Sequence, residues 1–416
     1  MKTIKHTEIT ENFYKYQDFE GIESVSSIIS DVKKGGDKAV KEYSKKFGDG
    51  DLIELELTQA EIQKAYEETP EEVINALKKA IENVKNFAQA QLSSIKGLET
   101  NNNGIKLGHK IIPLERIGAY VPGGNYPLPS SVIMSAVPAK VAGVKEVIVC
   151  SPKIQPATIA ACKLAEVDRV FRVGGAQAIA AMAYGTETIP KVNKITGPGN
   201  KYVTAAKKEV YGVCGIDFLA GPSEVMIIAD ETANASFIAA DMLAQCEHDP
   251  EARAYLITTS ESLLREVIDK TEEFLKTLPT REIAQRAISE SYIIITENIN
   301  QAIEISDRKA PEHLEICYCE AEKDIERYKN YGSLFIGNYS AEVLGDYCSG
   351  TNHVLPTNGV ARYTGGLSVF DFIKIQTYQQ VSKEAAQNNL CGTASIIANI
   401  EGLIAHKLSA DLRKDI

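Results

Sequence analysis

The sequence lacks the features that mark secreted, membrane-bound and nucleic-acid-binding proteins. Its first residues, Met1-Lys-Thr-Ile-Lys-His-Thr-Glu8, contain no apolar segment of a signal peptide, and no apolar run approaches the length of a membrane span. The formal net charge of -11 would repel nucleic acids and anionic membranes. We therefore expect a cytoplasmic protein whose partner is a small molecule, with no nucleic-acid or membrane partner.

Metal-binding and redox motifs are also scarce. The eight cysteines are scattered and none forms a Cys-x-x-Cys pair, which argues against a cysteine-rich zinc site or a disulfide framework. Only six histidines occur, and four of them follow residue 240, beside carboxylates, glycines or amides. Metal or proton chemistry is therefore expected in the second half of the chain.

What the sequence does contain is an ordinary globular composition, at a length sufficient for two or three domains. Of its 416 residues, 44% are hydrophobic and 24% are charged. Residues 1 to about 100 are predicted to be helical, with helix starts at Thr58 and at Thr69. The apolar stripe after Thr69 has helical spacing and is expected to pack in the core. Asn103-Gly104 predicts a hairpin turn.

Residues 117 to 229 alternate short apolar runs with helix-length segments, which predicts parallel strands joined by crossover helices. The runs are Ile117–Val121, Val147–Cys150, Val170–Val173, Lys194–Thr196, Phe218–Ala220 and Val225–Ala229. Most of them end in glycine-rich turns, namely Pro122-Gly-Gly-Asn125, Gly174-Gly-Ala-Gln177, Gly197-Pro-Gly-Asn200 and Gly221-Pro-Ser223. We expect these turns to share one edge of a sheet, where such folds bind ligands.

A second series of strands and helices follows. Strands are predicted near Ala254–Thr258, Tyr292–Thr296, Leu314–Cys317 and Leu334–Ile336, with helices around 261–277, 281–289 and 297–307. The segment from Gly345 to Gly366 has the composition of a loop. From about Lys374 the chain is predicted to be helical to its end.

One apolar helix stands out because it is predicted to stop at Pro250, with Gln245 and His248 on one face of its last turn. Together they could bind a cation or a polar substrate. The alternative, from these residues alone, is a C-terminal histidine that interacts with the helix dipole beside a solvated glutamine. Glu312 and His313 are similarly ambiguous, because an isolated Glu-His pair is usually on the surface.

Eight ordered motifs together resemble histidinol dehydrogenase. They are Gly118-Ala-Tyr-Val-Pro-Gly-Gly124, Val173-Gly-Gly-Ala-Gln-Ala-Ile-Ala180, Ile195-Thr-Gly-Pro-Gly-Asn-Lys-Tyr-Val203, Ala220-Gly-Pro-Ser-Glu-Val225, Gln245-Cys-Glu-His-Asp249, Ala310-Pro-Glu-His-Leu-Glu315, Gly345–Thr357 and Glu401-Gly-Leu-Ile-Ala-His406. The resemblance covers nearly the whole chain, and eight motifs in order are far more specific than one glycine loop.

The resemblance implies an α/β fold with two Rossmann-like parallel-sheet domains, a helical N-terminal segment and a helical C-terminal tail. Residues 1–119 with 225–367 would form the domain carrying the metal and catalytic residues, with residues 1–20 as an N-terminal extension. Residues 120–224 would bind NAD, and residues 368–416 would form the tail and its dimer contacts. The implied reaction is the oxidation of L-histidinol to L-histidine through the aldehyde, with two NAD+, the last step of histidine biosynthesis.

The resemblance also implies the roles of individual residues. Zinc, one ion per subunit, would be bound by Gln245, His248, Asp346 and His406, and the substrate by Ser223, Gln245, His248, His313, Asp346, Glu401 and His406. His313 would be the general base and Glu312 would activate water. Tyr120, Gln177 and Asn200 would contact NAD. The implied assembly is a homodimer in which the tail of one subunit completes the site of its partner.

Three features leave room for other interpretations. No G-x-G-x-x-G fingerprint is present, so the glycine turns alone indicate only some phosphate or small ligand. Zinc beside a Glu and a His would also suit a hydrolase, although no His-Glu-x-x-His occurs. A binding protein without turnover is a third possibility.

Glu401 and His406 would diverge on one straight helix, so either the helix begins after Glu401 or the substrate lies across its end. We expect His353 to make a structural hydrogen bond in its loop.

Overall fold

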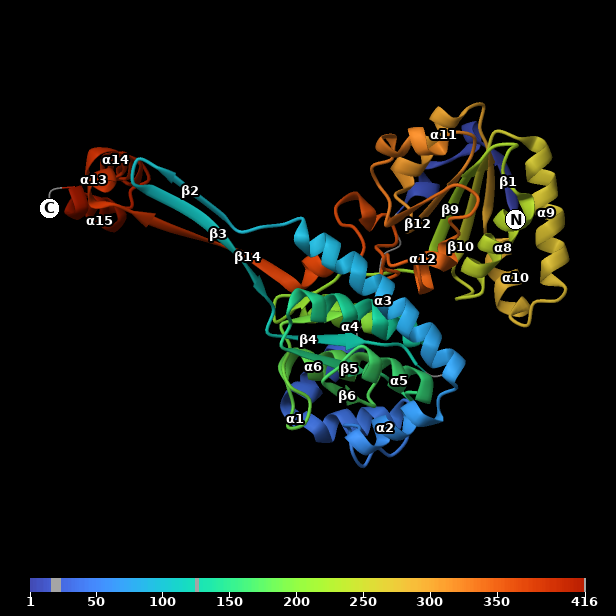
Figure 1. Ribbon diagram of the computed structural model, residues 1–416, viewed down its shortest axis with the longest axis horizontal. Coiled ribbons are helices and arrows are strands. Elements are labelled where there is room, and N and C mark those ends of the chain that lie inside the picture. Colours follow the sequence, from blue (N-terminus) through green and yellow to red (C-terminus); the bar gives the residue numbers. More distant parts are fainter. Residues whose placement is uncertain (16–23, 124–126, 415–416) are drawn as a thin grey trace. The chain divides into compact units, whose positions relative to one another are not determined.

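The computed structural model describes residues 1–15, 24–123 and 127–414. It divides into two compact units, one formed by Met1–Ala90 with Leu114–Phe372 and the other by Gln91–Pro113 with Ile373–Ile416. The first unit contains two parallel sheets and the second contains an antiparallel one (Figure 1). The predicted α/β fold with two Rossmann-like sheets is confirmed.

The five-stranded sheet of the first unit has the strand order β6-β5-β4-β7-β8, with every pair parallel. Its strands are β4 (Arg116–Tyr120), β5 (Glu146–Cys150), β6 (Arg169–Phe171), β7 (Lys194–Thr196) and β8 (Gly215–Ile216). They alternate with α4 (Pro129–Ala142), α5 (Pro156–Leu164), α6 (Gly175–Tyr184) and α7 (Lys201–Val210). The order reverses between β4 and β7, as in doubly wound folds.

Three N-terminal helices precede this sheet, namely α1 (Ser24–Lys46), α2 (Gln59–Glu68) and α3 (Glu71–Ser93). The predicted helix start at Thr58 is confirmed, because its side chain accepts a hydrogen bond from Glu61 N while the Glu61 carboxylate accepts one from Thr58 N. α1 packs against α6, and α2 packs against α5. Helix α1 therefore shares a core with the five-stranded sheet.

The six-stranded sheet of the first unit has the order β1-β11-β10-β9-β12-β13 and is also parallel throughout. Its strands are β1 (Lys2–Lys5), β9 (Glu224–Ala229), β10 (Arg253–Thr258), β11 (Tyr292–Ile295), β12 (His313–Cys317) and β13 (Ser333–Ile336). The helices are α8 (Ala235–Cys246), α9 (Glu261–Leu275), α10 (Arg281–Ser289), α11 (Ile299–Lys309) and α12 (Glu342–Tyr347). Apart from β1, the order matches that of the five-stranded sheet.

The central strand β9 shows why these segments form strands. All of its residues are buried, with Val225 and Ile227 packing on the α8 side and Met226 and Ile228 on the opposite side. Covering both faces of a parallel sheet explains the continuous apolar run. Each such side chain contributes about 1.5–3 kcal/mol of burial free energy, so these strands dominate the core.

The second unit contains the predicted hairpin. Its sheet has the order β14-β3-β2, formed by β2 (Leu98–Asn102), β3 (Ile105–Pro113) and β14 (Ile373–Val381). Asn103 and Gly104 both adopt positive φ, at 50° and 84°, as a tight hairpin turn requires. The chain then forms α13 (Lys383–Ala385), a π-helical turn (Ala386–Leu390), α14 (Cys391–Ile400) and α15 (Ile404–Lys414).

Three predictions that concern strands are wrong. Lys2–Lys5 is a strand rather than helix, because its backbone pairs with β11, far away in the sequence. Ile373–Val381 is likewise a strand that pairs with β3. Phe218–Ala220 forms no strand, and Phe218 N donates a hydrogen bond to Asp217 Oδ1 at 2.8 Å rather than to a neighbouring strand. The other predicted strands are confirmed.

The expectation that the glycine turns share one edge also needs correction. The turns after Phe171 and Thr196 follow β6 and β7 of the five-stranded sheet, whereas Gly221–Ser223 precedes β9 of the six-stranded sheet. Part of the Pro122–Asn125 turn lies outside the described residues. Within the described ranges, no helix combines the length and apolarity needed to span a bilayer.

Candidate active site

The two catalytic residues expected from the sequence lie at the amino end of β12, beside the amino end of the neighbouring strand β9. Glu312 and His313 are both buried. The Glu312 carboxylate accepts a hydrogen bond from Glu224 N at 2.9 Å, and His313 Nδ1 lies 3.3 Å from the Glu224 carbonyl oxygen. The backbone of one strand therefore fixes both side chains of the next.

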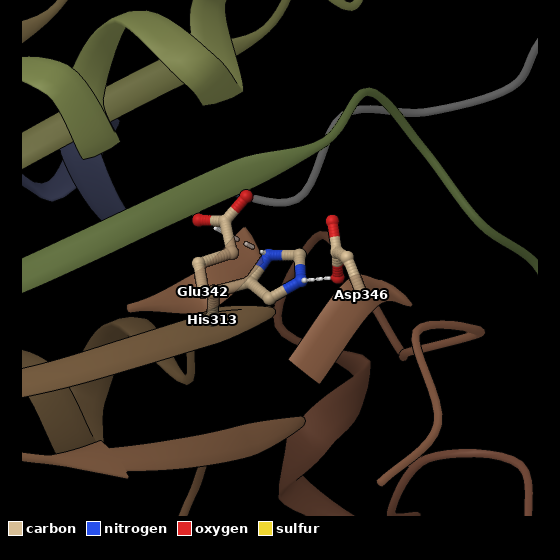
Figure 2. Close-up of side chains that lie close together, drawn as sticks. All are labelled: His313, Glu342 and Asp346. Carbon is tan, nitrogen blue, oxygen red and sulfur yellow. Dashed lines mark ion pairs between the residues drawn. The ribbon is translucent and has the colours of Figure 1, made fainter. Parts of the chain in front are cut away.

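The short helix α12 places two carboxylates around the His313 ring (Figure 2). Glu342 Oε2 lies 3.9 Å from Nδ1, and Asp346 Oδ1 lies 3.4 Å from Nε2. The two acids are four residues apart, so they share one face of the helix. Their oxygens and the imidazole form the group in the described residues whose geometry could hold a metal ion. Asp346 therefore lies in a helix, which corrects the prediction of a loop from Gly345.

Charge around His313 is predominantly negative. Burial alone would lower the pKa of the imidazole, but the charges of Glu342 and Glu312 raise it well above its ordinary value. Burial raises the pKa of Glu312 to about 8, against the opposing influence of His313. Burial would also raise the pKa of Asp346, but the interaction with His313 and the charges of His353 and His248 lower it. Asp346 is therefore the acid that stays ionised.

His313 Nε2 is buried without a hydrogen-bond partner among the described residues. Its 3.4 Å separation from Asp346 Oδ1 is long for an N–H···O bond, so the contact is an ion pair at most. A buried ring nitrogen left without a partner loses free energy unless some other group binds it. The second ring nitrogen is occupied by the Glu224 carbonyl. Nε2 is therefore the atom that a substrate would meet.

The helix that carries Gln245 and His248 ends earlier than predicted. α8 stops at Cys246. Beyond it, His248 N donates to Gln245 O at 3.4 Å, a hydrogen bond that spans three residues instead of the four of an α-helix. His248 itself is exposed and lies in the bend after the helix. Gln245 is buried. With its amide nitrogen facing the acid, Gln245 donates to Glu342 Oε2 at 3.1 Å and accepts from Glu224 N at 3.3 Å. The end of α8 is thereby joined to α12.

Two further histidines, His353 and His248, interact with Asp346 in addition to His313. His353 Nδ1 bonds the Asp346 carbonyl oxygen at 2.9 Å, which confirms the structural hydrogen bond expected for it. His248 lies near enough for its charge to lower the pKa of Asp346. The structure thus brings Gln245, His248 and Asp346 into one neighbourhood of the first unit.

The other expected substrate residues are Ser223 in the first unit and Glu401 and His406 in the second. Ser223 directly precedes β9, and its carbonyl oxygen accepts a hydrogen bond from Arg253 N at 3.1 Å. Glu401 and His406 belong to the second unit and are exposed. Glu401 caps α14 and α15 begins at Ile404, so of the two alternatives for this pair, a helix beginning after Glu401 is the one observed.

Tyr120, Gln177 and Asn200 lie at the carboxyl edge of the five-stranded sheet. Tyr120 ends β4, and its hydroxyl accepts a hydrogen bond from Gly175 N at 3.2 Å. Gln177 is buried in the first turn of α6, and its Oε1 has no hydrogen-bond partner in the described residues. Asn200 caps α7 by accepting from the backbone at 3.0 and 3.2 Å. Two helix N-termini therefore face this edge.

Comparison with known proteins identifies the family. The family model described as histidinol dehydrogenase matches residues 14–414. Histidinol dehydrogenase of Methanocaldococcus jannaschii is 46% identical over 93% of this chain and 91% of its own length, and that of Streptococcus mutans is 46% identical over 94% and 92%. The crystal structure of the Elizabethkingia anophelis enzyme matches with a TM-score of 0.93 at 37% identity, covering 99% of this chain and 98% of that one.

The chain belongs to the histidinol dehydrogenase family. It is accordingly an enzyme, an oxidoreductase that acts on an alcohol, and its family places it in histidine biosynthesis. This membership does not favour the zinc hydrolase that the residue types alone had left open. The binding protein without turnover loses its support for the same reason.

Two acids of this histidinol dehydrogenase family member were missed by sequence reasoning. Glu342 contacts His313 and Gln245, and the backbone of Glu224 contacts the side chains of Glu312 and His313. Glu224 also pairs with Lys309 at 3.6 Å in a buried setting. The available signal was the four-residue spacing from Glu342 to Asp346, which has meaning only once that segment is known to be helical.

Proposed function

We propose that this enzyme catalyses the NAD-dependent, four-electron oxidation of L-histidinol to L-histidine through L-histidinaldehyde, with zinc in the site. The observation that carries the proposal is the buried Glu312–His313 pair, in which His313 Nε2 has no partner among the described residues. This atom suits an alcohol proton. Family membership supplies the substrate, because the relatives are named for histidinol.

His313 is the general base of the proposal. In the neutral imidazole that a general base requires, a proton on Nδ1 would be donated to the Glu224 carbonyl oxygen at 3.3 Å, which leaves Nε2 with a free lone pair. The buried carboxylates raise the pKa of His313 and oppose this neutral form, and a cation bound by Asp346 would offset their charge. Nε2 then accepts the alcohol proton while hydride leaves the carbinol carbon. The same atom accepts a proton in the second oxidation, from the hydrate of the aldehyde. One imidazole therefore serves both oxidations.

Glu312 activates the water that adds to the aldehyde. Its carboxylate is held by Glu224 N at 2.9 Å and lies 3.7 Å from His313 Nδ1, so it is fixed beside the imidazole ring. A pKa raised to about 8 makes it a stronger base than an exposed glutamate. Only the second oxidation consumes water, so only that step needs Glu312.

The donor set fits zinc. Gln245, His248 and Asp346 offer an amide oxygen, an imidazole and a carboxylate with a lowered pKa, and this mixture of nitrogen and oxygen ligands suits Zn2+. A cation would also offset the excess of buried carboxylates around His313. His406, from the second unit, would complete the set. Zinc, when bound, orients the alcohol and stabilises negative charge on its oxygen.

The substrate would be held by residues of the same neighbourhood together with the second unit. Those proposed are Ser223, Gln245, His248, His313, Asp346, Glu401 and His406. The zinc ligands in this group would orient the imidazole and amino groups of histidinol. Glu401 and His406 are exposed, so neither side chain is buried in a hydrophobic core and both can contact a ligand.

The carboxyl edge of the five-stranded sheet suits a dinucleotide. Its helix N-termini at Gly175 and Lys201 carry the positive ends of helix dipoles, which favour phosphate. The unpartnered Oε1 of Gln177 is available to a ligand donor. We assign NAD contacts to Tyr120, Gln177 and Asn200, within a cofactor-binding segment 120–224. NAD+, when bound, accepts the hydrides.

The remaining segments take the other tasks. Residues 225–367 would carry the metal and catalytic residues, whereas α1 and α2 of the segment 1–119 pack against α6 and α5 of the five-stranded sheet. Residues 368–416 would act as a tail that contacts the partner of a homodimer. Several large apolar side chains of α14 and α15 are exposed in the single chain, namely Ile396, Ile397, Ile400, Ile404, Leu408 and Leu412. Such a surface commonly marks an interface.

The assembly is tested by subunit complementation. If the tail completes the partner's site, mixing His406→Ala with His248→Ala subunits creates heterodimers that each hold one intact site. Random exchange of equal amounts should restore about a quarter of wild-type activity, since half the dimers are mixed and each has one of two sites. No recovery, under conditions where exchange is shown by labelled subunits, would place the whole site in one chain.

The reaction is tested by counting NADH per histidinol in single turnovers. Wild-type enzyme should yield two NADH, whereas Glu312→Gln should yield one and stall at the aldehyde level, which a carbonyl reagent traps. Glu315→Gln is a matched control because Glu315 is also a buried acid of β12 with a pKa raised to about 8, but its carboxylate accepts a hydrogen bond from Glu342 N rather than from Glu224 N. Two NADH from Glu312→Gln at near wild-type rate would contradict the division of labour, and the absence of NADH from wild type would contradict the function.

A further inference from the structure

The five-stranded sheet contains a buried ion pair whose two members both bind one glycine. Lys207 on α7 pairs with Asp217, which follows β8, and their side chains are only 3% and 1% exposed. Lys207 Nζ donates to the Gly197 carbonyl oxygen at 3.0 Å, and Gly197 N donates to Asp217 Oδ2 at 2.8 Å. The pair therefore holds Gly197 by both of its backbone polar groups.

Gly197 is also fixed from a third direction. Its φ of 107° is unfavourable for residues with a side chain, and a Cβ at this position would lie 2.1 Å from the Tyr120 carbonyl oxygen. The Cα of Gly197 therefore packs closely against the backbone at the end of β4, where only a glycine fits. Lys207, Asp217 and Tyr120 come from three separate segments, so the position of Gly197 depends on all of them.

The held glycine begins the turn that ends at Asn200. Asn200 caps α7, and Lys207, on that same helix, reaches back to the glycine. The turn is thus anchored at its first residue by the ion pair and at its last residue by the cap. It follows β7, one of the two strands between which the strand order reverses. Ligands of such folds bind at this point.

A buried ion pair is a weak source of stability, because the loss of hydration offsets most of the attraction between the charges. Replacing both charges by apolar side chains of similar volume is often neutral for stability. What apolar side chains would not replace here are the two hydrogen bonds to Gly197. The distinguishing contribution of Lys207 and Asp217 is therefore the geometry of the turn.

We propose that Lys207 and Asp217 are positioning residues for the dinucleotide, which hold the turn Gly197–Asn200 in its binding conformation before the cofactor arrives. This rests on the proposed NAD-dependent function. The pair touches neither the substrate site nor the metal ligands, so its loss acts on cofactor binding alone. Preorganised binding sites lose affinity when the ordering must occur on binding.

The test uses the charge-free variant Lys207→Met/Asp217→Leu, together with Asp217→Asn, in purified zinc-loaded enzyme. NAD+ affinity, measured by calorimetry, should fall about tenfold or more, which corresponds to the loss of one or two hydrogen bonds. Zinc content and the affinity for histidinol should stay unchanged. KM for NAD+ should rise while kcat at saturating NAD+ changes little.

A matched control lies at the opposite edge of the same sheet. Arg116 and Glu146 pair at 2.5 Å between the first residues of β4 and β5, with side chains that are 32% and 25% exposed. The variant Arg116→Met/Glu146→Leu also removes an ion pair from this sheet but leaves the turn intact. It should bind NAD+ as the wild type does.

The outcomes separate the inference from the function on which it rests. Wild-type enzyme that neither binds NAD+ nor reduces it would refute the proposed function. If the wild type is active, the positioning role would be refuted by a charge-free variant that binds NAD+ as tightly as the wild type does. It would also be refuted by a variant that loses affinity for histidinol as much as it loses affinity for NAD+. Should the variants not fold, hydrogen exchange in the wild type decides, since peptides covering Gly197 should be equally protected with and without NAD+. Protection that appears only with NAD+ would overturn the inference.

Discussion

The two parallel sheets of the first unit share one strand order but present their functional groups at opposite edges. In the five-stranded sheet, Tyr120 ends β4 and the turn at Gly197 follows β7, so the proposed cofactor contacts lie at the carboxyl edge. In the six-stranded sheet, Glu224 begins β9 and His313 begins β12, so the proposed catalytic groups lie at the amino edge. Both pairs of strands are the ones between which the order reverses.

The choice of edge agrees with the charge of the ligand proposed for each sheet. Helices α6 and α7 begin at the carboxyl edge of the five-stranded sheet, where their positive dipole ends suit phosphate. Helices α8 and α11 end at the amino edge of the six-stranded sheet, where their negative ends suit a cation or an imidazolium. The same architecture thus offers an anion site or a cation site, according to which edge carries the side chains.

The strongest way to separate the two edges is His313→Asn. Loss of the general base should lower kcat by about a hundredfold to ten-thousandfold in both oxidations. The Kd of NAD+ should not change, because the variant leaves the other edge untouched. Calorimetry and stopped-flow absorbance measure the two quantities, and His109→Asn on β3 is the control. A large loss of NAD+ affinity in His313→Asn would show that the edges are not independent.

His248→Asn should remove zinc from the amino edge. Activity is expected to fall by more than about tenfold to a hundredfold, which is the loss typical of residues that only support a metal ligand. The protein should remain folded, because a catalytic metal contributes less to folding than a structural one. Metal analysis and circular dichroism of the purified variant provide the check. Full zinc content in this variant would contradict the assigned ligand set.

The pH dependence should differ between the two oxidations. The pKa of Glu312 is raised from 4.5 to about 8, so this acid is mostly protonated below pH 8 and cannot accept a proton from water. The second NADH phase should therefore slow about tenfold for each pH unit below about 8, until another step limits the rate. Single-turnover absorbance from pH 6 to 9 resolves the two phases. An identical profile in Glu312→Gln would contradict the role of Glu312.

The smallest expected effect concerns the carboxyl edge. Gly197→Ala should destabilise the protein by about 1–3 kcal/mol and weaken NAD+ binding, because it combines a positive φ with a collision against Tyr120. Gly212→Ala is the matched control, since Gly212 has a φ of 102° but a Cβ added there would meet no atom within 4 Å. Urea unfolding compares the two. Equal losses would assign the whole effect to backbone strain rather than to the contact with β4.

The fold of the first unit was largely predictable, because strands buried on both faces appear as continuous apolar runs such as Val225–Ala229. The capping box at Thr58 and the turn at Asn103-Gly104 were predictable for local reasons. Strand β1 was not, since Lys2–Lys5 is ordered by pairing with a distant partner. A local pattern carries no information about such a partner.

The candidate site followed the same rule. Glu312 and His313 were identified through a family motif, whereas Glu342 gained significance only when α12 placed it beside His313. Lys207 and Asp217 are ten residues apart in segments without a recognisable motif, and only the fold shows that both reach Gly197. Residues that act by holding others are therefore the ones that sequence patterns leave unmarked.

The position of β1 has a consequence for synthesis on the ribosome. Every strand of the five-stranded sheet lies between Arg116 and Ile216, so that sheet can form while the rest of the chain is still being made. β1 is synthesised before these strands, yet Lys2 pairs with Tyr292, so β1 cannot pair until nearly three hundred further residues have been made. A nascent chain that ends between Ile216 and Tyr292 contains the complete five-stranded sheet, while β1 still lacks its partner strand. We expect this partly folded chain, with its unpaired strand, to be the species most prone to aggregation and to capture by chaperones.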